Sequence, residues 1–207
     1  MLKRLVFFFI FSTSFVSAQI DYSDSWEDFF SYNNVKDFVK VDNMLYALSD
    51  NAIFTYDDTT QEIEKLSSVQ GLSGETTSAI HYSIETNRLV IGYENGLIEV
   101  VDSDGSITIS ADIVSFNQTG EKSINDIFEY QGKLYLSTSF AIVEYDITEL
   151  EFGDTFFIGN NSTDVNIHQI TVFNDRIFAA TENGIFYADS ANPNLIDFNN
   201  WNTITSA

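Results

Sequence analysis

The chain has 207 residues, of which 44% are hydrophobic and 19% are charged, and this composition excludes a disordered or fibrous protein. Its 31 acidic residues outnumber 9 basic residues and give a formal net charge of -22, which excludes nucleic acid as a partner because the chain would repel a phosphate backbone. The sequence contains no cysteine, which excludes disulfides, thiolate chemistry and cysteine-ligated metal sites.

Residues 1–18 have the pattern of a secretory signal peptide. Basic residues open the chain, a short apolar run follows, and small residues precede Ala18. The apolar run is too short to span the roughly 30 Å of hydrocarbon that a membrane anchor must cross. We therefore expect cleavage between Ala18 and Gln19 and export of a mature chain, residues 19–207, that has no transmembrane span.

An internal repeat indicates the fold class. Four segments align without gaps, and an aliphatic residue preceded by a small residue follows eight positions after the start of each. Four short strands in a period of about 40–50 residues are typical of a β-propeller blade. The four segments start 44, 45 and 43 positions apart, at Leu45, Leu89, Leu134 and Ile177.

The first unit shows how each blade is expected to be built. Its apolar runs predict strands at 38–41, 45–49, 53–56 and 63–66, separated by turn sequences. In the second and fourth units an Asn-Gly pair stands between the second and third strands and suits a two-residue hairpin turn. The predicted fold is an all-β propeller with four-stranded antiparallel blades of about 44 residues.

About four blades are expected, at 35–72, 76–118, 123–163 and 165–207. Residues 26–32 resemble a lone outermost strand placed ahead of the first blade, and residues 201–205 resemble a similar strand at the other end. In a closed four-bladed ring these two strands would compete for one outer position. We therefore expect the chain to be the first part of a larger ring that is cut short.

No arrangement of side chains typical of catalysis is found. His81 and His168 are the only histidines and lie in different units, so they are not expected to share a metal ion. Residues 71–74 have the wrong glycine spacing for a nucleophile elbow and predict a tight turn between two blades. Residues 102–105 begin like a calcium loop but lack its later carboxylates, which favours a hairpin turn. No metal or other cofactor is expected.

Four segments carry a resemblance to a known family: WEDFFSYNN at 26–34, QGLSG at 70–74, IGYENGLI at 91–98 and LYLSTSFAIVEYD at 134–146. With them the chain resembles, over residues 26–207, the N-terminal propeller of the PorZ family of the Bacteroidetes type IX secretion system. The third copy departs from the others because Ser139 and Phe140 replace polar turn residues. The pattern of apolar strand, Asn-Gly turn and apolar strand is shared with the sensor propellers of hybrid two-component regulators.

The resemblance implies a non-catalytic interaction scaffold. Members of the family carry two seven-bladed propellers and a C-terminal secretion-signal domain, so this chain would form part of the first ring. They lie at the cell surface, associated with the outer membrane, in an attachment complex with the sortase PorU and the proteins PorV and PorQ. There the family is thought to present anionic lipopolysaccharide to the sortase, which joins it to secreted cargo.

Two other functions remain open. A periplasmic sensor propeller of a two-component regulator would bind a glycan and would need a membrane helix and a kinase further along the gene. A propeller enzyme would need converging side chains in the central channel, and few basic residues are present to supply them.

If the chain is a binding module, its contacts are expected in loops on one face of the ring. The loops considered lie at 50–52, 70–75, 94–96 and 182–184. The candidate binding residues are Asn51, Gly71, Ser73, Gly74, Glu94, Asn95, Glu182 and Asn183.

Overall fold

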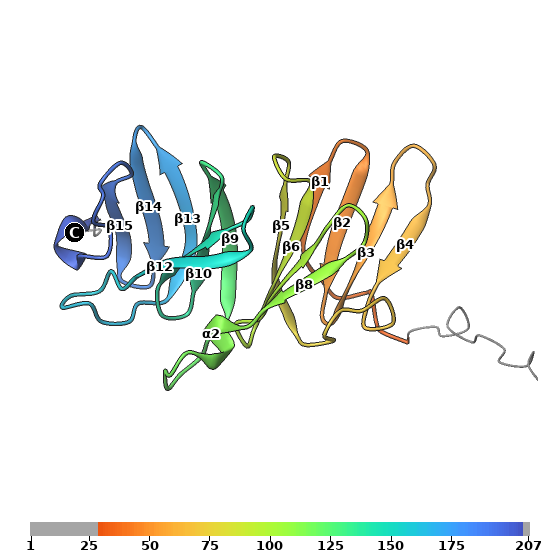
Figure 1. The fold of residues 1–207 in the computed structure, drawn as a ribbon, viewed down its shortest axis with the longest axis horizontal. Helices are drawn as coiled ribbons and strands as arrows, with labels where there is room; N and C mark the ends of the chain where they lie inside the picture. Colours follow the sequence, from red (N-terminus) through yellow and green to blue (C-terminus); the bar gives the residue numbers. More distant parts are fainter. Residues whose placement is uncertain (1–28, 205–207) are drawn as a thin grey trace, which may run out of the picture.

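The computed structural model describes residues 29–204, so the expected signal peptide and its Ala18–Gln19 junction lie outside the described residues. The described chain forms four antiparallel sheets of four strands each (Figure 1). The sheets follow one another along the chain as the blades of a β-propeller, and they form an open arc rather than a closed ring. The predicted all-β propeller with four-stranded blades is confirmed.

Each blade contains four consecutive strands, hydrogen-bonded in chain order. The first strands of successive blades contact one another, which places them along the inside of the arc and the fourth strands outside. Blade 1 comprises β1 (Val35–Val41), β2 (Met44–Ser49), β3 (Ala52–Asp57) and β4 (Ile63–Leu66); blade 2 comprises β5 (Thr77–Ser83), β6 (Arg88–Tyr93), β7 (Ile98–Val101) and β8 (Ile107–Ser110); blade 3 comprises β9 (Ile124–Tyr130), β10 (Lys133–Thr138), β11 (Ile142–Asp146) and β12 (Glu151–Phe156); blade 4 comprises β13 (Ile167–Phe173), β14 (Arg176–Thr181), β15 (Gly184–Asp189) and β16 (Asn202–Ile204).

The core consists of apolar layers between neighbouring blades. Leu48 and Ile53 of blade 1 belong to one cluster with Ile91 of blade 2, and further clusters of the same kind join blade 2 to blade 3 and blade 3 to blade 4. Trp201 lies in the last of these clusters, and its Nε1 donates to the carbonyl oxygen of Leu195 at 2.9 Å. Burial of apolar area between sheets is therefore the main force that holds the arc together.

A hydroxyl group closes the hairpin between the second and third strands in three of the blades. The last residue of the second strand donates to a backbone carbonyl three positions later, at 2.7 to 2.8 Å. These pairs are Ser49 with Ala52, Thr138 with Ala141 and Thr181 with Gly184. In blade 2 the equivalent residue is Tyr93, whose hydroxyl is used elsewhere.

The first strand of every blade contains an irregularity at its second residue. The ladder with the second strand skips this residue, as in a β-bulge, in all four blades. A bulge redirects the side chain of the extra residue, and in blades 1 and 3 that side chain bonds to a backbone carbonyl oxygen of the next blade. The residues concerned are Lys36, Ser78, Asn125 and His168.

Of the two strands expected at the ends of the chain, the second is present, whereas the described part of the first forms no strand. Residues 29–32, the described part of the first region, take part in no strand pairing; β4 is the outermost strand of blade 1, and β16 is the outermost strand of blade 4. Instead, the ring of Tyr32 packs edge-on against Phe54, with ring centroids 6.1 Å apart. At the other end, residues 202–204 form β16 and complete blade 4 by pairing with β15.

The link between blades 2 and 3 explains the apolar turn in the third repeat. It contains the short helix α2 (Asp112–Ser115), and Phe116 just after it stacks on Phe140 with ring centroids 5.9 Å apart. Phe157 lies against both rings, and Phe140 is only 2% exposed. A polar residue would be buried at this turn, which is why Phe140 stands there. No helix within residues 29–204 is long and apolar enough to cross a membrane.

Candidate partner-binding face

All the candidate binding residues lie at one end of the blades. Because the strands alternate in direction, the hairpins between second and third strands share this end with the links between blades. We call it the lower face, since it is at the bottom of Figure 1. It comprises the hairpins at 50–51, 94–97, 139–141 and 182–183 and the links at 67–76, 111–123 and 157–166.

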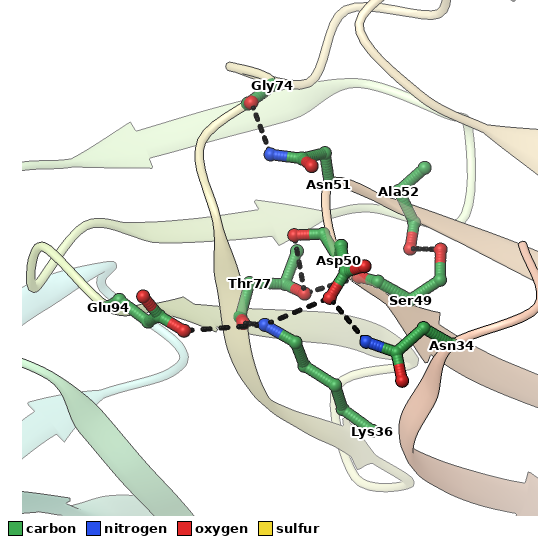
Figure 2. Close-up of polar contacts among 9 residues, drawn as sticks. All are labelled: Asn34, Lys36, Ser49, Asp50, Asn51, Ala52, Gly74, Thr77 and Glu94. Atoms are coloured by element: carbon green, nitrogen blue, oxygen red, sulfur yellow. Dashed lines mark hydrogen bonds and ion pairs between the residues drawn. The ribbon is translucent and has the colours of Figure 1, made fainter. Parts of the chain in front are cut away.

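Lys36 is at the centre of a polar network that joins blade 1 to blade 2 (Figure 2). Its Nζ donates to the carbonyl oxygen of Thr77, the first residue of β5, at 2.8 Å. The same Nζ lies 3.6 Å from Oδ1 of Asp50 and 3.4 Å from Oε1 of Glu94. Asp50 also accepts a hydrogen bond from Nδ2 of Asn34 at 2.8 Å. One ammonium group therefore connects the hairpins of two blades.

Thr77 and Asn51 close the same junction (Figure 2). The backbone N–H of Thr77 donates to the carbonyl oxygen of Asp50 at 2.9 Å, and its hydroxyl donates to the carbonyl oxygen of Ser49. Nδ2 of Asn51 donates to the carbonyl oxygen of Gly74 at 3.0 Å. Two of the residues predicted from the sequence, Asn51 and Gly74, are thus brought into direct contact.

A buried carboxylate holds the predicted residue Ser73 in place. Oε1 of Glu99 accepts the backbone N–H of Ser73 at 2.8 Å, and its Oε2 accepts the hydroxyl of Tyr93. Glu99 is 0% exposed, so these bonds replace the water it would otherwise need. Burial, followed by the bond to Glu99 and its charge, raises the pKa of Tyr93 far above the ordinary range. Tyr93 therefore stays protonated and remains a hydrogen-bond donor.

Gly71 and Gly74 allow the link between blades 1 and 2 to turn. Their φ angles are +113° and +77°, in the region that side chains with a Cβ rarely adopt. A Cβ at Gly71 would also lie 3.3 Å from Cδ1 of Ile107. The tight turn predicted at 71–74 is present, and both glycines serve its geometry.

The remaining candidates lie in hairpins of different blades. The backbone N–H of Glu94 donates to the carbonyl oxygen of Thr76 at 2.9 Å, while its side chain is largely exposed. Oδ1 of Asn95 accepts the N–H of Leu97 at 3.0 Å and shapes the hairpin. Glu182 and Asn183 are exposed on blade 4, so the structure does not bring them to the Lys36 network.

A hollow of about 420 Å³ opens beside the Lys36 network, between blade 1, blade 2 and the link to blade 3. It contains one ammonium group and two carboxylates, so it offers both signs of charge with a negative excess. The hydroxyl of Ser78 is buried and has no hydrogen-bond partner within residues 29–204. The lining consists of Lys36, Thr77, Ser78, Glu94, Glu121 and Ser123.

The two histidines serve different roles. Nε2 of His81 lies 2.9 Å from Oε2 of Glu129, whose other oxygen accepts the hydroxyl of Ser83 at 2.9 Å, so the group joins blades 2 and 3. His168 is exposed at its bulge position in β13. Over the described range, 29–204, no cluster of three or more His, Cys, Asp or Glu side chains is placed to hold a metal ion.

Residues 102–105 form the hairpin between β7 and β8. Gly105 has a φ of +84°, and its N–H donates to the carbonyl oxygen of Asp102 at 2.9 Å. Oδ1 of Asp102 accepts Nε of Arg88 at 2.7 Å. The side chain of Asp102 is therefore committed to an ion pair, in keeping with the predicted hairpin turn.

Sequence reasoning did not identify Lys36 or Glu99, although the side chains of both hold segments of the lower face in place. Lys36 occupies the second position of a first strand, and aligned repeats place Ser78, Asn125 and His168 there. Nδ2 of Asn125 makes the same bond in blade 3, to the carbonyl oxygen of Ile167 at 2.7 Å. Glu99 could have been noticed as a lone charge in the apolar strand Ile98–Val101.

Comparison with protein families then identifies the domain. The family model described as the N-terminal β-propeller domain of PorZ, of the type IX secretion system, matches residues 45–202. The chain belongs to this family. The match includes all four hairpins and all three links of the lower face, and it begins after β1. No curated protein sequence matches the chain.

Solved structures of low sequence identity share the fold. PorZ of Porphyromonas gingivalis, described as an essential bacterial surface component of the type IX secretion system, is 20% identical with a TM-score of 0.71, over 83% of this chain and 22% of that one. The extracellular domain of a one-component system from B. thetaiotaomicron is 13% identical with a TM-score of 0.66, over 88% and 24% of the two chains. The extracellular domain of a hybrid two-component system from the same organism gives 18% and 0.62, over 76% and 22%. The chain spans less than a quarter of the length of each.

Proposed function

We propose that this chain is propeller sequence of a cell-surface component of the type IX secretion system and works there as a non-catalytic scaffold. The observation that carries the proposal is the family match over residues 45–202. The lower face is the contact surface, because the hairpins and links gathered there present side chains from successive blades. Exposed loops on a rigid scaffold are where binding residues concentrate.

The charge of this surface favours a basic partner. Several basic groups of the described chain are occupied within the fold, which leaves carboxylates facing outward. Nζ of Lys122 donates to two carbonyl oxygens of its own link, and Nη1 of Arg88 donates to the carbonyl oxygen of Thr148 in blade 3. Attraction between an acidic face and a basic partner speeds association and weakens as salt is added.

The resemblance names the partners that this proposal includes. They are the sortase PorU and the outer-membrane proteins PorV and PorQ, which would place the chain at the cell surface. Anionic lipopolysaccharide is a less direct partner, because a polyanion would be repelled by the acidic face unless a divalent cation bridged the two.

Co-purification of the native complex tests the proposal. The tagged full-length gene product, expressed in its own bacterium, is expected to retain the sortase and its outer-membrane companions. Replacing Glu94 and Glu182 together by alanine should lower their recovery at least threefold, because both side chains are exposed on the lower face. Glu62 and Glu149 are exposed at the opposite end, and their double alanine variant is the matched control.

Unchanged recovery of the partners with the lower-face variant would show that this surface is not the contact.

A sensor function would give a different result in the same experiment. The structural similarity to extracellular domains of one- and two-component systems extends only to the fold. If the gene product is a sensor, it should co-purify without any secretion component, and the gene should continue into a membrane helix and a signalling domain.

A further inference from the structure

A second hollow, of about 270 Å³, lies between blades 3 and 4, at the opposite end of the blades from the lower face. Strands β10, β11 and β12 form one wall, and the long loop between β15 and β16 forms the other. The groups that matter for its chemistry are Lys133, Tyr135, Glu144, Asp154, Phe156 and Asn192.

The carboxylate of Glu144 is built into this hollow. Glu144 is 7% exposed, and its Oε2 accepts Nζ of Lys133 at 2.9 Å. The pairing of β11 with β12 is irregular between Val143 and Tyr145, where Glu144 faces two residues of β12, Gly153 and Asp154, in place of one. Gly153 makes room, since a Cβ there would lie 3.1 Å from Cβ and 3.2 Å from Oε2 of Glu144. The position of the carboxylate thus depends on three separate features of the fold.

The neighbours of Glu144 have fixed hydrogen-bonding roles. Burial, with a contribution from the charge and hydrogen bond of Glu144, raises the pKa of Tyr135 to about 12, so its hydroxyl keeps its proton. The hydrogen bond to Glu144 also raises the pKa of Lys133, which therefore remains charged. The hollow presents donors from Lys133 and Tyr135 beside acceptors from Glu144 and Asp154.

The net charge of the residues that line this hollow limits which kinds of ligand it can bind. One ammonium and two carboxylates leave a net negative charge, which disfavours a phosphate or a carboxylate group. A cationic amine would instead meet the ammonium of Lys133. A neutral molecule that both donates and accepts hydrogen bonds suits this set, and its apolar side can lie against the half-buried ring of Tyr130.

We infer that the hollow between blades 3 and 4 binds a neutral sugar ring. The carboxylates of Glu144 and Asp154 accept hydrogen bonds from its hydroxyl groups, and the side-chain amide of Asn192 forms a hydrogen bond at the edge of the ring. This inference goes beyond the proposed function, which assigns the lower face to protein partners. The two surfaces lie at opposite ends of the blades, so either can fail without the other.

Titration with simple glycosides tests the inference. Saturation-transfer NMR and calorimetry would follow methyl α-D-glucoside, methyl α-D-mannoside, methyl α-D-galactoside and methyl N-acetylglucosaminide binding to the full-length gene product. At least one is expected to bind saturably. Glu144→Gln should raise its Kd roughly tenfold, the loss of a hydrogen bond to a charged group. Asp154 is exposed, so the Asp154→Asn variant should fold normally, and it should also raise the Kd of the glycoside.

Two controls show whether the sugar occupies this hollow and in what form it binds. The variant Glu62→Ala, at an exposed position on blade 1, should leave the glycoside Kd unchanged. Oligosaccharides of the sugar that binds, compared with its methyl glycoside, distinguish a free sugar from one unit of a polysaccharide. The inference is overturned if no glycoside binds, if neither variant changes the Kd, or if inorganic phosphate binds more tightly than every glycoside.

Discussion

Replacing Gly96 by alanine is expected to destabilise blade 2 by about 3 kcal/mol, the combined cost of a positive φ and of overpacking. Gly96 has a φ of +87° in the hairpin between β6 and β7. A Cβ there would lie 2.5 Å from Cγ2 of Ile113 and 2.9 Å from the carbonyl oxygen of Lys122. The new methyl group would therefore displace the link that carries α2.

Gly105 provides the matched control for this substitution. Its φ of +84° is nearly the same, but a Cβ at Gly105 would meet no atom within 4 Å. Gly105→Ala should therefore cost only about 1 kcal/mol, from the backbone conformation alone. Hydrogen exchange of the amides of β6 and β7 in the full-length gene product measures both losses. Equal losses would mean that the contact with Ile113 does not constrain the hairpin.

Tyr93→Phe is expected to cost about 2–3 kcal/mol, because it leaves the buried carboxylate of Glu99 without its hydroxyl donor. Among residues 29–204, only the N–H of Ser73 would then remain bonded to Glu99. Tyr145 is also 0% exposed, and its hydroxyl lies 2.9 Å from Oγ of Ser110, an uncharged partner. Tyr145→Phe should cost about 1 kcal/mol of stability, and hydrogen exchange of the full-length gene product measures both variants. A cost for Tyr93→Phe no larger than this would contradict a structural role for Glu99.

The stability of the wild type and of Tyr93→Phe should also respond differently to alkaline pH. An unfolded tyrosine loses its proton near pH 10, whereas burial and Glu99 keep the pKa of Tyr93 higher in the folded state. The stabilisation from Tyr93 is therefore complete below pH 10 and falls as the pH rises above it. Between pH 9 and pH 11 the wild type should lose about 1 kcal/mol more than the variant. An equal loss would show that Tyr93 ionises normally.

The strands could be predicted from the sequence because each blade repeats a local pattern. The alternation of apolar runs with Asn-Gly and Asp-rich turns gave the first blade to within three residues at every strand end. Gly96 and Gly184 have the positive φ that such turns require. Local turn chemistry is enough to locate hairpins, and the period is enough to indicate the propeller.

The contacts that build the lower face could not be predicted in the same way. Lys36 bonds to a residue 41 positions away, and Ser73 bonds to a carboxylate 26 positions away, so both depend on how neighbouring blades pack. The bulge that redirects Lys36 has no local sequence signature. The burial of Phe140 depends on the link that covers it, and in the sequence this residue stood out only as a departure from the repeat.

Deletion of the gene in the bacterium that carries it tests the central claim most directly. If the chain is part of a type IX secretion component, surface anchoring of the system's cargo should be lost in the deletion strain. Normal anchoring should return when the full-length gene is supplied, as measured by labelling of intact cells. Cargo that remains anchored at wild-type levels after the deletion would contradict the account.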